Sequence, residues 1–247
     1  MELIHIIILT SLLNVSSIIL VIYFKSFFFN IFNNYNPIQK IHDGYVPPIG
    51  GVIIFINFFL GLFLINSNFY NNIKILLGSI LIIGIGIIED FSGKVSPTIR
   101  FLIILIASII YTYGDTNLPY IEIPILNWLL TNLPFFGIVF FSLGLTTVSN
   151  GINMIDGVNG LAGLTSLSIL IAIFSVLILN DKLKFYLNEI IFLSLGICIF
   201  LIFNFPFGKI FLGDAGAYWI GWILGILVIE VYANVSTNTW GAALILF

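Results

Sequence analysis

Residues 3–24 read LIHIIILTSLLNVSSIILVIYF, an apolar stretch without a charged side chain. An α-helix needs about 20 such residues to cross the hydrocarbon core of a bilayer. Seven similar runs follow, over residues 50–65, 73–88, 97–113, 133–148, 161–179, 185–203 and 215–232. Lipid offers no partners for free backbone groups, so these runs must be helices. We predict an all-α, polytopic transmembrane helix bundle with about eight full spans and the start of a ninth near Trp240.

The composition supports a protein surrounded by lipid. Of the 247 residues, 60% are hydrophobic and 8% are charged, and the mean hydropathy is +1.18. A soluble domain usually carries about 25% charged residues. The net charge is −3 and there is no basic run, which argues against a nucleic-acid partner. We find no internal repeat and expect one transmembrane domain over residues 1–247, with the lipid bilayer as its partner.

The polar connections between the runs alternate in character. The first, third, fifth and seventh connections share one side, and they cover residues 25–49, 89–96, 149–160 and 204–214. This side, counting Arg100, carries five basic residues against three on the other, which favours the cytoplasm. On the opposite side, the prolines and β-branched residues of LPYIEIPIL (118–126) predict a short extended or hairpin segment.

The fifth connection has the most informative pattern, NGINMIDGVNGLAG over residues 150–163. Asn150, Asn153 and Asp156 are spaced by three, which places their oxygen-bearing side chains on one face of a helical turn. Asn159 follows, among glycines that let the backbone approach a ligand closely. The next helix begins at Leu161, and its N-terminus favours an anion.

Two further connections bring carboxylates to helix ends. Glu89 and Asp90 are adjacent at the end of one span, and Asp214 begins another within the sequence GDAG. Charged groups near spanning helices are costly and usually functional. Lys209 precedes Asp214 by five residues and suits a phosphate, while Phe211 offers a flat face for a base.

The first connection reads YNPIQKIHDGYVPPIGG over residues 35–51. Lys40 and His42 lie two residues apart, which suits contact with phosphate from an extended stretch. Carboxylate and amide oxygens are the ligands that Mg²⁺ prefers, and it commonly binds through one or two carboxylates and substrate phosphates. The four connections together predict metal-assisted handling of a phosphate at a membrane surface.

Four motifs in this order resemble those of the polyprenyl-phosphate N-acetylhexosamine-1-phosphate transferases, glycosyltransferase family 4. They are QKIHDGYVPPIGG, GIIED with the following SP, NGINMIDGVNGLAG and IFLGDAGAYWIG. The resemblance is nearest to the undecaprenyl-phosphate N-acetylglucosaminyl-1-phosphate transferase branch. It implies Mg²⁺-dependent transfer from a UDP-N-acetylhexosamine to polyprenyl (undecaprenyl) phosphate, with release of UMP. This reaction begins cell-envelope polysaccharide synthesis, such as that of O-antigen, at the cytoplasmic face of the bacterial inner (plasma) membrane.

The resemblance also implies roles for single residues. Asp214 would bind the metal, with Asn153 as a second oxygen ligand. Asp90 would be the base that deprotonates the lipid phosphate, and Asp156 would serve as ligand or base. Glu89 would complete the catalytic carboxylates. The residues expected to contact phosphate or nucleotide are Lys40, His42, Asn150, Asn159, Lys209 and Phe211. Direct attack and a covalent aspartyl step both remain open.

Some positions depart from the family pattern. Glu89 stands where relatives usually have Asp, and Asn159 replaces a second Asp. The chain also ends in an apolar run where relatives continue with further spans and a His-rich loop, so we expect it to be C-terminally truncated. A catalytically inactive remnant or an accessory lipid-phosphate-binding membrane protein is the alternative. A transporter is disfavoured because the acidic residues lie at span ends. A homodimer is left open.

Overall fold

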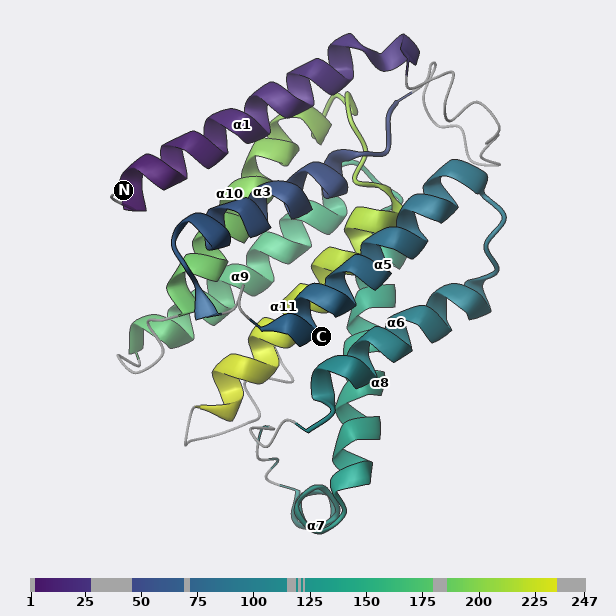
Figure 1. The fold of residues 1–247 in the computed structure, drawn as a ribbon, viewed down its shortest axis with the longest axis vertical. Helices are drawn as coiled ribbons and strands as arrows, with labels where there is room; N and C mark the ends of the chain where they lie inside the picture. The colour runs from purple at the N-terminus through teal and green to yellow at the C-terminus, as the bar shows by residue number, and fades with distance from the viewer. Residues whose placement is uncertain are drawn as a thin grey trace.

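The computed structural model describes residues 3–27, 46–68, 72–114, 119, 121, 123–179 and 186–234. This part of the chain forms helices and no strand, as predicted. The helices are α1 (Leu3–Tyr23), α3 (Gly50–Leu64), α5 (Ile73–Ser92), α6 (Pro97–Thr112), α7 (Pro124–Asn132), α8 (Pro134–Ile155), α9 (Leu161–Leu179), α10 (Leu187–Asn204) and α11 (Gly213–Ala233). Figure 1 shows them as one bundle, with α1 along its edge and α7 at the foot of α8.

Each of the eight predicted spans corresponds to a helix of this bundle. Six of these helices are long and apolar enough to cross a membrane: α1, α5, α8, α9, α10 and α11. The other two, α3 and α6, are apolar but have 15 and 16 residues. The protein is therefore a multi-pass membrane protein.

Helix α11 is the centre of the bundle. Its residues from Ala215 to Ile229 are all buried, because α3, α5, α8 and α9 pack around it (Figure 1). Small residues permit this close packing, as is usual between helices in lipid. A Cβ at Gly51 of α3 would lie 2.0 Å from the Cα of Gly216, and one at Gly86 of α5 would lie 2.2 Å from the Cα of Ala215.

Two indole groups of α11 find polar partners inside the bundle. The indole N–H of Trp219 donates to Ser79 Oγ of α5 at 3.1 Å, and that of Trp222 donates to Ser108 Oγ of α6 at 3.0 Å. Both tryptophans are fully buried. A buried indole N–H needs such an acceptor, so these pairs fix how α11 is turned relative to α5 and α6.

The structure differs from the predicted boundaries at three places. Helix α5 continues to Ser92 and α8 to Ile155, so Glu89, Asp90 and Asn153 lie on helices rather than in connections. The predicted extended segment is wrong from Pro124 onward, where α7 begins, whereas Ile123 just before it has an extended backbone. A proline at the first helical position favours that start.

Candidate active site

The N-terminus of α11 is held by a carboxylate of α5. The two oxygens of Asp90 accept hydrogen bonds from the backbone N–H groups of Asp214, at 2.8 Å, and Ala215, at 3.2 Å. The preceding residue, Gly213, has a φ of +79°. A Cβ there would lie 2.3 Å from the carbonyl oxygen of Pro48 and 2.8 Å from the Asp90 carboxylate. Glycine is therefore required where three segments meet.

The side chain of Asp214 lies at the centre of a polar cluster. Its Oδ1 accepts from the amide of Asn153 at 3.0 Å, and its Oδ2 accepts from Arg100 Nη1 at 2.5 Å. The same Nη1 lies 3.6 Å from Oε1 of Glu89. The Arg100 guanidinium carbon lies 5.9 Å from the centre of the Tyr218 ring. The Arg100 guanidinium thus joins the carboxylates of Glu89 on α5 and Asp214 on α11. Asn153 connects α8 to the same cluster.

A short turn between α5 and α6 positions this arginine. Gly93 ends α5 in a left-handed conformation, and Oε2 of Glu89 accepts from the backbone N–H of Val95 at 2.8 Å. Ser96 then caps α6 by accepting from Ile99 N–H at 3.3 Å. Arg100 therefore lies in the first turn of α6, next to the end of α5.

Asp156 caps the C-terminal end of α8. Burial, followed by the negative charges of Asp214 and Asp90, raises the pKa of Asp156 to about 8. A group whose pKa lies near neutrality, in a cluster of carboxylates, is typical of a functional site.

A buried amide joins the two loops beside the cluster. Oδ1 of Asn204, at the end of α10, accepts from the Gly160 N–H at 2.7 Å, and its amide donates to the Ile210 carbonyl at 2.9 Å. Across the same junction, Asn159 donates to the Pro206 carbonyl at 3.5 Å. The turn after α8 and the loop before α11 therefore form one unit.

The loop before α11 also carries Lys209 and Phe211. Lys209 is exposed, and its ammonium lies 5.5 Å from the centre of the Phe207 ring. The backbone of Phe211 pairs with the start of α3: its N–H donates to the Pro47 carbonyl at 3.1 Å, and its carbonyl accepts from Gly50 N–H at 2.9 Å. This pairing brings the end of the first connection to the cluster.

The structure thus brings together five of the eleven predicted site residues, namely the four carboxylates and Asn153. Glu89, Asp90, Asn153, Asp156 and Asp214 meet at one end of the bundle through the contacts and charge interactions above. The Asn150 amide instead donates to the Thr146 carbonyl of its own helix at 2.8 Å. Lys40 and His42 lie outside the described residues.

The sequence analysis did not assign Arg100 to the site. One signal could have identified it, because it is the single charged residue in the apolar run 97–113. An ionisable side chain within such a run generally has a partner and a function. The prediction used Arg100 only as evidence for the orientation of the protein in the membrane.

Comparison with known proteins identifies relatives along most of the chain. The family model described as glycosyl transferase family 4 matches residues 72–232. A protein of Bacillus subtilis (strain 168), provisionally named as an undecaprenyl-phosphate N-acetylglucosaminyl 1-phosphate transferase, is 28% identical over 214 residues. That alignment covers 80% of this chain and 55% of the relative.

Two further relatives come from other branches. A protein of Sulfolobus acidocaldarius, provisionally named as a UDP-N-acetylglucosamine–dolichyl-phosphate N-acetylglucosaminephosphotransferase, is 32% identical over 79% of this chain and 62% of its own length. The phospho-N-acetylmuramoyl-pentapeptide-transferase of Streptococcus pneumoniae (strain D39) is 28% identical over 75% of this chain and 60% of its own length. The chain thus spans less than two thirds of each of these relatives. Because the family model covers more than half of the chain, including Asp90, Asp156 and Asp214, the chain belongs to glycosyl transferase family 4.

Proposed function

We propose that this protein transfers an N-acetylhexosamine-1-phosphate from a UDP-sugar to polyprenyl phosphate and releases UMP. The observation that carries the proposal is the Asp214 carboxylate at the N-terminus of α11, where Asn153 and Arg100 converge on it. The relatives' names supply the substrate classes, because they include transferases of N-acetylglucosamine phosphate to polyprenyl phosphates. The reaction would begin the synthesis of a cell-envelope polysaccharide.

The reaction exchanges one phosphorus–oxygen bond for another. An oxygen of the polyprenyl phosphate attacks the β-phosphorus of the UDP-sugar. The bond from this phosphorus to the oxygen bridging the α- and β-phosphates breaks, and UMP leaves with the electron pair. Positioning and charge neutralisation dominate such transfers. Arg100, which contacts Asp214 at the start of α11, is placed to supply positive charge to a phosphate there.

The oxygen-bearing side chains of the cluster fit a Mg²⁺ ion that is bound partly by the protein and partly by the substrate. Asp214 and Asn153 would be its protein ligands, and both offer the oxygen atoms that Mg²⁺ prefers. Among the described residues, no three His, Cys, Asp or Glu side chains lie close enough to hold a metal together. Mg²⁺ usually binds one or two carboxylates and completes its shell with water and substrate phosphates. When bound, it would neutralise the diphosphate. Arg100 would then release the Asp214 carboxylate and bind a substrate phosphate instead.

We assign different tasks to the two remaining aspartates. Both oxygens of Asp90 accept backbone N–H groups of α11, so Asp90 positions Asp214. Because both Asp90 oxygens are engaged in this way, we assign the removal of a proton from the lipid phosphate to Asp156, whose pKa of about 8 lies near the working pH, where proton transfer is most effective. Asp156 thus replaces Asp90 as our candidate base.

The site would face the cytoplasm of the plasma (inner) membrane. The connections that form it carry five of the eight basic residues, counting Arg100. A UDP-sugar donor is a soluble, highly charged molecule, and it would approach from this side, while the polyprenyl chain stays in the bilayer.

The experiment is to measure UMP release from UDP-N-acetylglucosamine by membranes that contain the full product of the gene. Undecaprenyl phosphate is supplied, with and without Mg²⁺. Asp214→Asn should abolish the Mg²⁺-dependent release without affecting membrane insertion. Lys94→Gln, which removes an exposed charge outside the cluster, is the control and should retain it. Retained release in Asp214→Asn would refute the metal-ligand assignment.

A second outcome would favour the alternative function. If the wild type binds polyprenyl phosphate but releases no UMP from any N-acetylated UDP-sugar, the protein is an accessory lipid-phosphate-binding protein. The ion pair between Arg100 and Asp214 is the feature that would support such a role, because it keeps a metal ligand engaged.

A further inference from the structure

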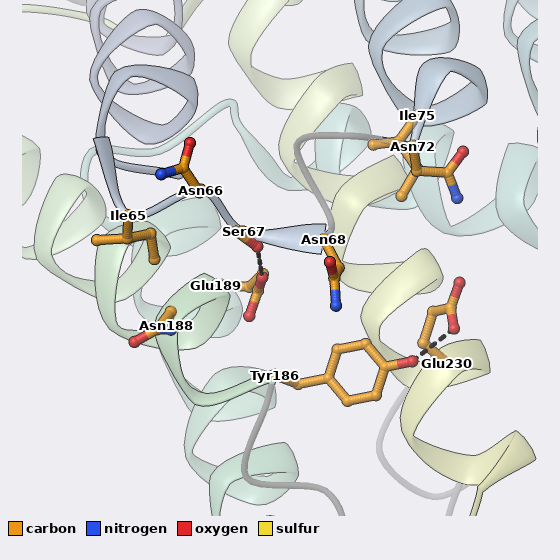
Figure 2. Close-up of a pocket in the computed structure, with 10 residues that line it drawn as sticks. All are labelled: Ile65, Asn66, Ser67, Asn68, Asn72, Ile75, Tyr186, Asn188, Glu189 and Glu230. Carbon is orange, nitrogen blue, oxygen red and sulfur yellow. Dashed lines mark hydrogen bonds between the residues drawn. The ribbon is translucent and has the colours of Figure 1, made fainter. Parts of the chain in front are cut away.

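A second polar site lies at the opposite end of the bundle. Helix α10 runs from this site to Asn204 at the carboxylate cluster, and its 18 residues span about 27 Å. The site is a cavity of about 360 Å³ between the α3–α5 connection and the nearby ends of α10 and α11. Figure 2 shows the side chains that line it around an open space, among them Ser67, Asn68, Tyr186, Asn188, Glu189 and Glu230.

Glu189 is the unusual member of this lining. It is 1% exposed and lies in the first turn of α10. The hydroxyl of Ser67 donates to its Oε1, but its Oε2 is buried without a hydrogen-bond partner among the described residues (Figure 2). A buried carboxylate without full compensation is costly, because burial removes the water that would otherwise solvate it. A ligand group that donates a hydrogen bond to this oxygen would relieve that cost.

The second carboxylate of the cavity already has its partners. Glu230 of α11 accepts the hydroxyl of Tyr111 at 2.7 Å and the hydroxyl of Tyr186 at 2.6 Å, one on each oxygen. These bonds hold Glu230 against the wall formed by α6 and the start of α10. Glu189 therefore has the greater need of an additional donor.

Among the described residues, the cavity lining holds no Lys, Arg or His to balance these two carboxylates. Its other polar members in that part of the chain are four asparagines, one serine and one tyrosine. The nearby Lys74 is not a lining residue, and its ammonium donates to the Tyr113 carbonyl at 2.7 Å. The cavity therefore favours a cation that carries hydrogen-bond donors.

We propose that this cavity binds the primary ammonium group of a small polar molecule, with Glu189 as its counter-ion. An ammonium has three N–H donors and no acceptor. One donor would meet the Glu189 carboxylate, and the amide oxygens of asparagines such as Asn68 and Asn188 would accept the others. A bare divalent ion fits less well, because Ca²⁺ takes six to eight oxygen ligands and the described residues hold no group of three acidic side chains. The volume also exceeds that of a single ion.

An ammonium at a membrane surface can come from two sources. One is the ethanolamine head group of a phospholipid, and the other is a free amine in solution. The melting temperature of purified protein in detergent is measured with ethanolamine. Choline is the matched ligand control, because its cation has the same charge but no N–H donor. Protein in nanodiscs of phosphatidylglycerol, with and without phosphatidylethanolamine, tests the lipid source.

The proposal requires a response that depends on Glu189. Ligand at ten times its dissociation constant should raise the melting temperature of the wild type by roughly 3–6 °C. Glu189→Gln, which keeps the shape and removes the charge, should lose this shift. Asn188→Phe, which fills the cavity and leaves the buried carboxylate in place, should lose it too. Asn132→Phe, the same change on the exposed surface of α7, should keep it.

Each outcome decides the proposal. A shift with ethanolamine but not choline supports a soluble amine, and a shift only in phosphatidylethanolamine nanodiscs supports the lipid head group. An equal shift in Glu189→Gln, an equal response to choline, stabilisation by Ca²⁺ alone or no response at all would overturn it. If Glu189→Gln does not fold, the comparison of Asn188→Phe with Asn132→Phe decides.

Discussion

Replacing Gly86 with alanine should separate α5 from α11 and disturb the candidate active site. The new Cβ would lie 2.2 Å from the Cα and 2.5 Å from the nitrogen of Ala215. Both are backbone atoms, so no flexible side chain can turn away. Restoring a contact of about 3.5 Å requires the helices to move apart by roughly 1.3 Å. Gly86 lies one turn before Asp90, so this movement would break the 2.8 Å hydrogen bond from the Asp214 N–H to the Asp90 carboxylate.

The magnitude follows from these terms. Overpacking of a close contact costs about 1–3 kcal/mol, and losing a hydrogen bond to a charged group costs about 1.5–3 kcal/mol. Alanine recovers up to about 1 kcal/mol through its higher helix propensity. Gly86→Ala should therefore destabilise the protein by about 1.5–6 kcal/mol. At roughly 2–4 °C per kcal/mol, its melting temperature should fall by at least about 3 °C.

Gly84 provides a matched control on the same helix. A Cβ at this position meets no atom within 4 Å. Gly84→Ala should leave stability unchanged or raise it by about 0.5–1 kcal/mol. Both variants are melted in the same detergent with tryptophan fluorescence as the readout, and UMP release is measured on the same preparations. Equal melting temperatures and equal UMP release in the two variants would refute the close-contact argument.

Three further changes test the site. Arg100→Gln should lower the rate of UMP release at least about tenfold because it removes the site's guanidinium, and Arg100→Lys should restore part of it; an unchanged rate in Arg100→Gln would exclude the role. Asp156 has a raised pKa and interacts electrostatically with Asp214, the proposed Mg²⁺ ligand, so Mg²⁺ binding should favour loss of the Asp156 proton, and apparent Mg²⁺ affinity should rise from pH 7 to pH 9. Calorimetric titration would measure this, and Asp156→Asn should weaken the dependence; a flat wild-type profile contradicts the linkage. Asn204→Ala removes the hydrogen-bond partners of the Gly160 N–H and the Ile210 carbonyl, so the free energy of unfolding should fall by about 1–3 kcal/mol, as measured by thermal melting. An unchanged melting temperature would show that these bonds add no stability.

The sequence predicted the helices well because lipid imposes a simple rule. Every apolar run of sufficient length became a helix. The helix ends were harder to predict, because an apolar run ends where the lipid ends, whereas a helix ends where its last backbone groups are satisfied. Gly93 ends α5 four residues after Glu89, and Asp156 ends α8 eight residues after Val148.

Only part of the site could be predicted, because the sequence pattern reports on single helices and not on how they pack together. Spacing identifies residues that share a helix face, as with Asn153 and Asp156, but pairing between helices depends on how the helices are turned. The ion pair between Arg100 and Asp214 joins residues 114 positions apart, and no local pattern connects them. The cavity around Glu189 could not be predicted for the same reason, because its lining comes from three separate parts of the chain.

The complete burial of α11 has a consequence for how the protein is made. Helix α11 is the last of the described helices in the chain, yet α3, α5, α8 and α9 all pack against it. These earlier helices enter the bilayer first, during translation, and lack their central partner until residue 233 has been synthesised. Until then, the faces of these helices that later contact α11 must lie against lipid or a chaperone. The described helices therefore assemble around α11, the last of them to be synthesised, rather than around the first.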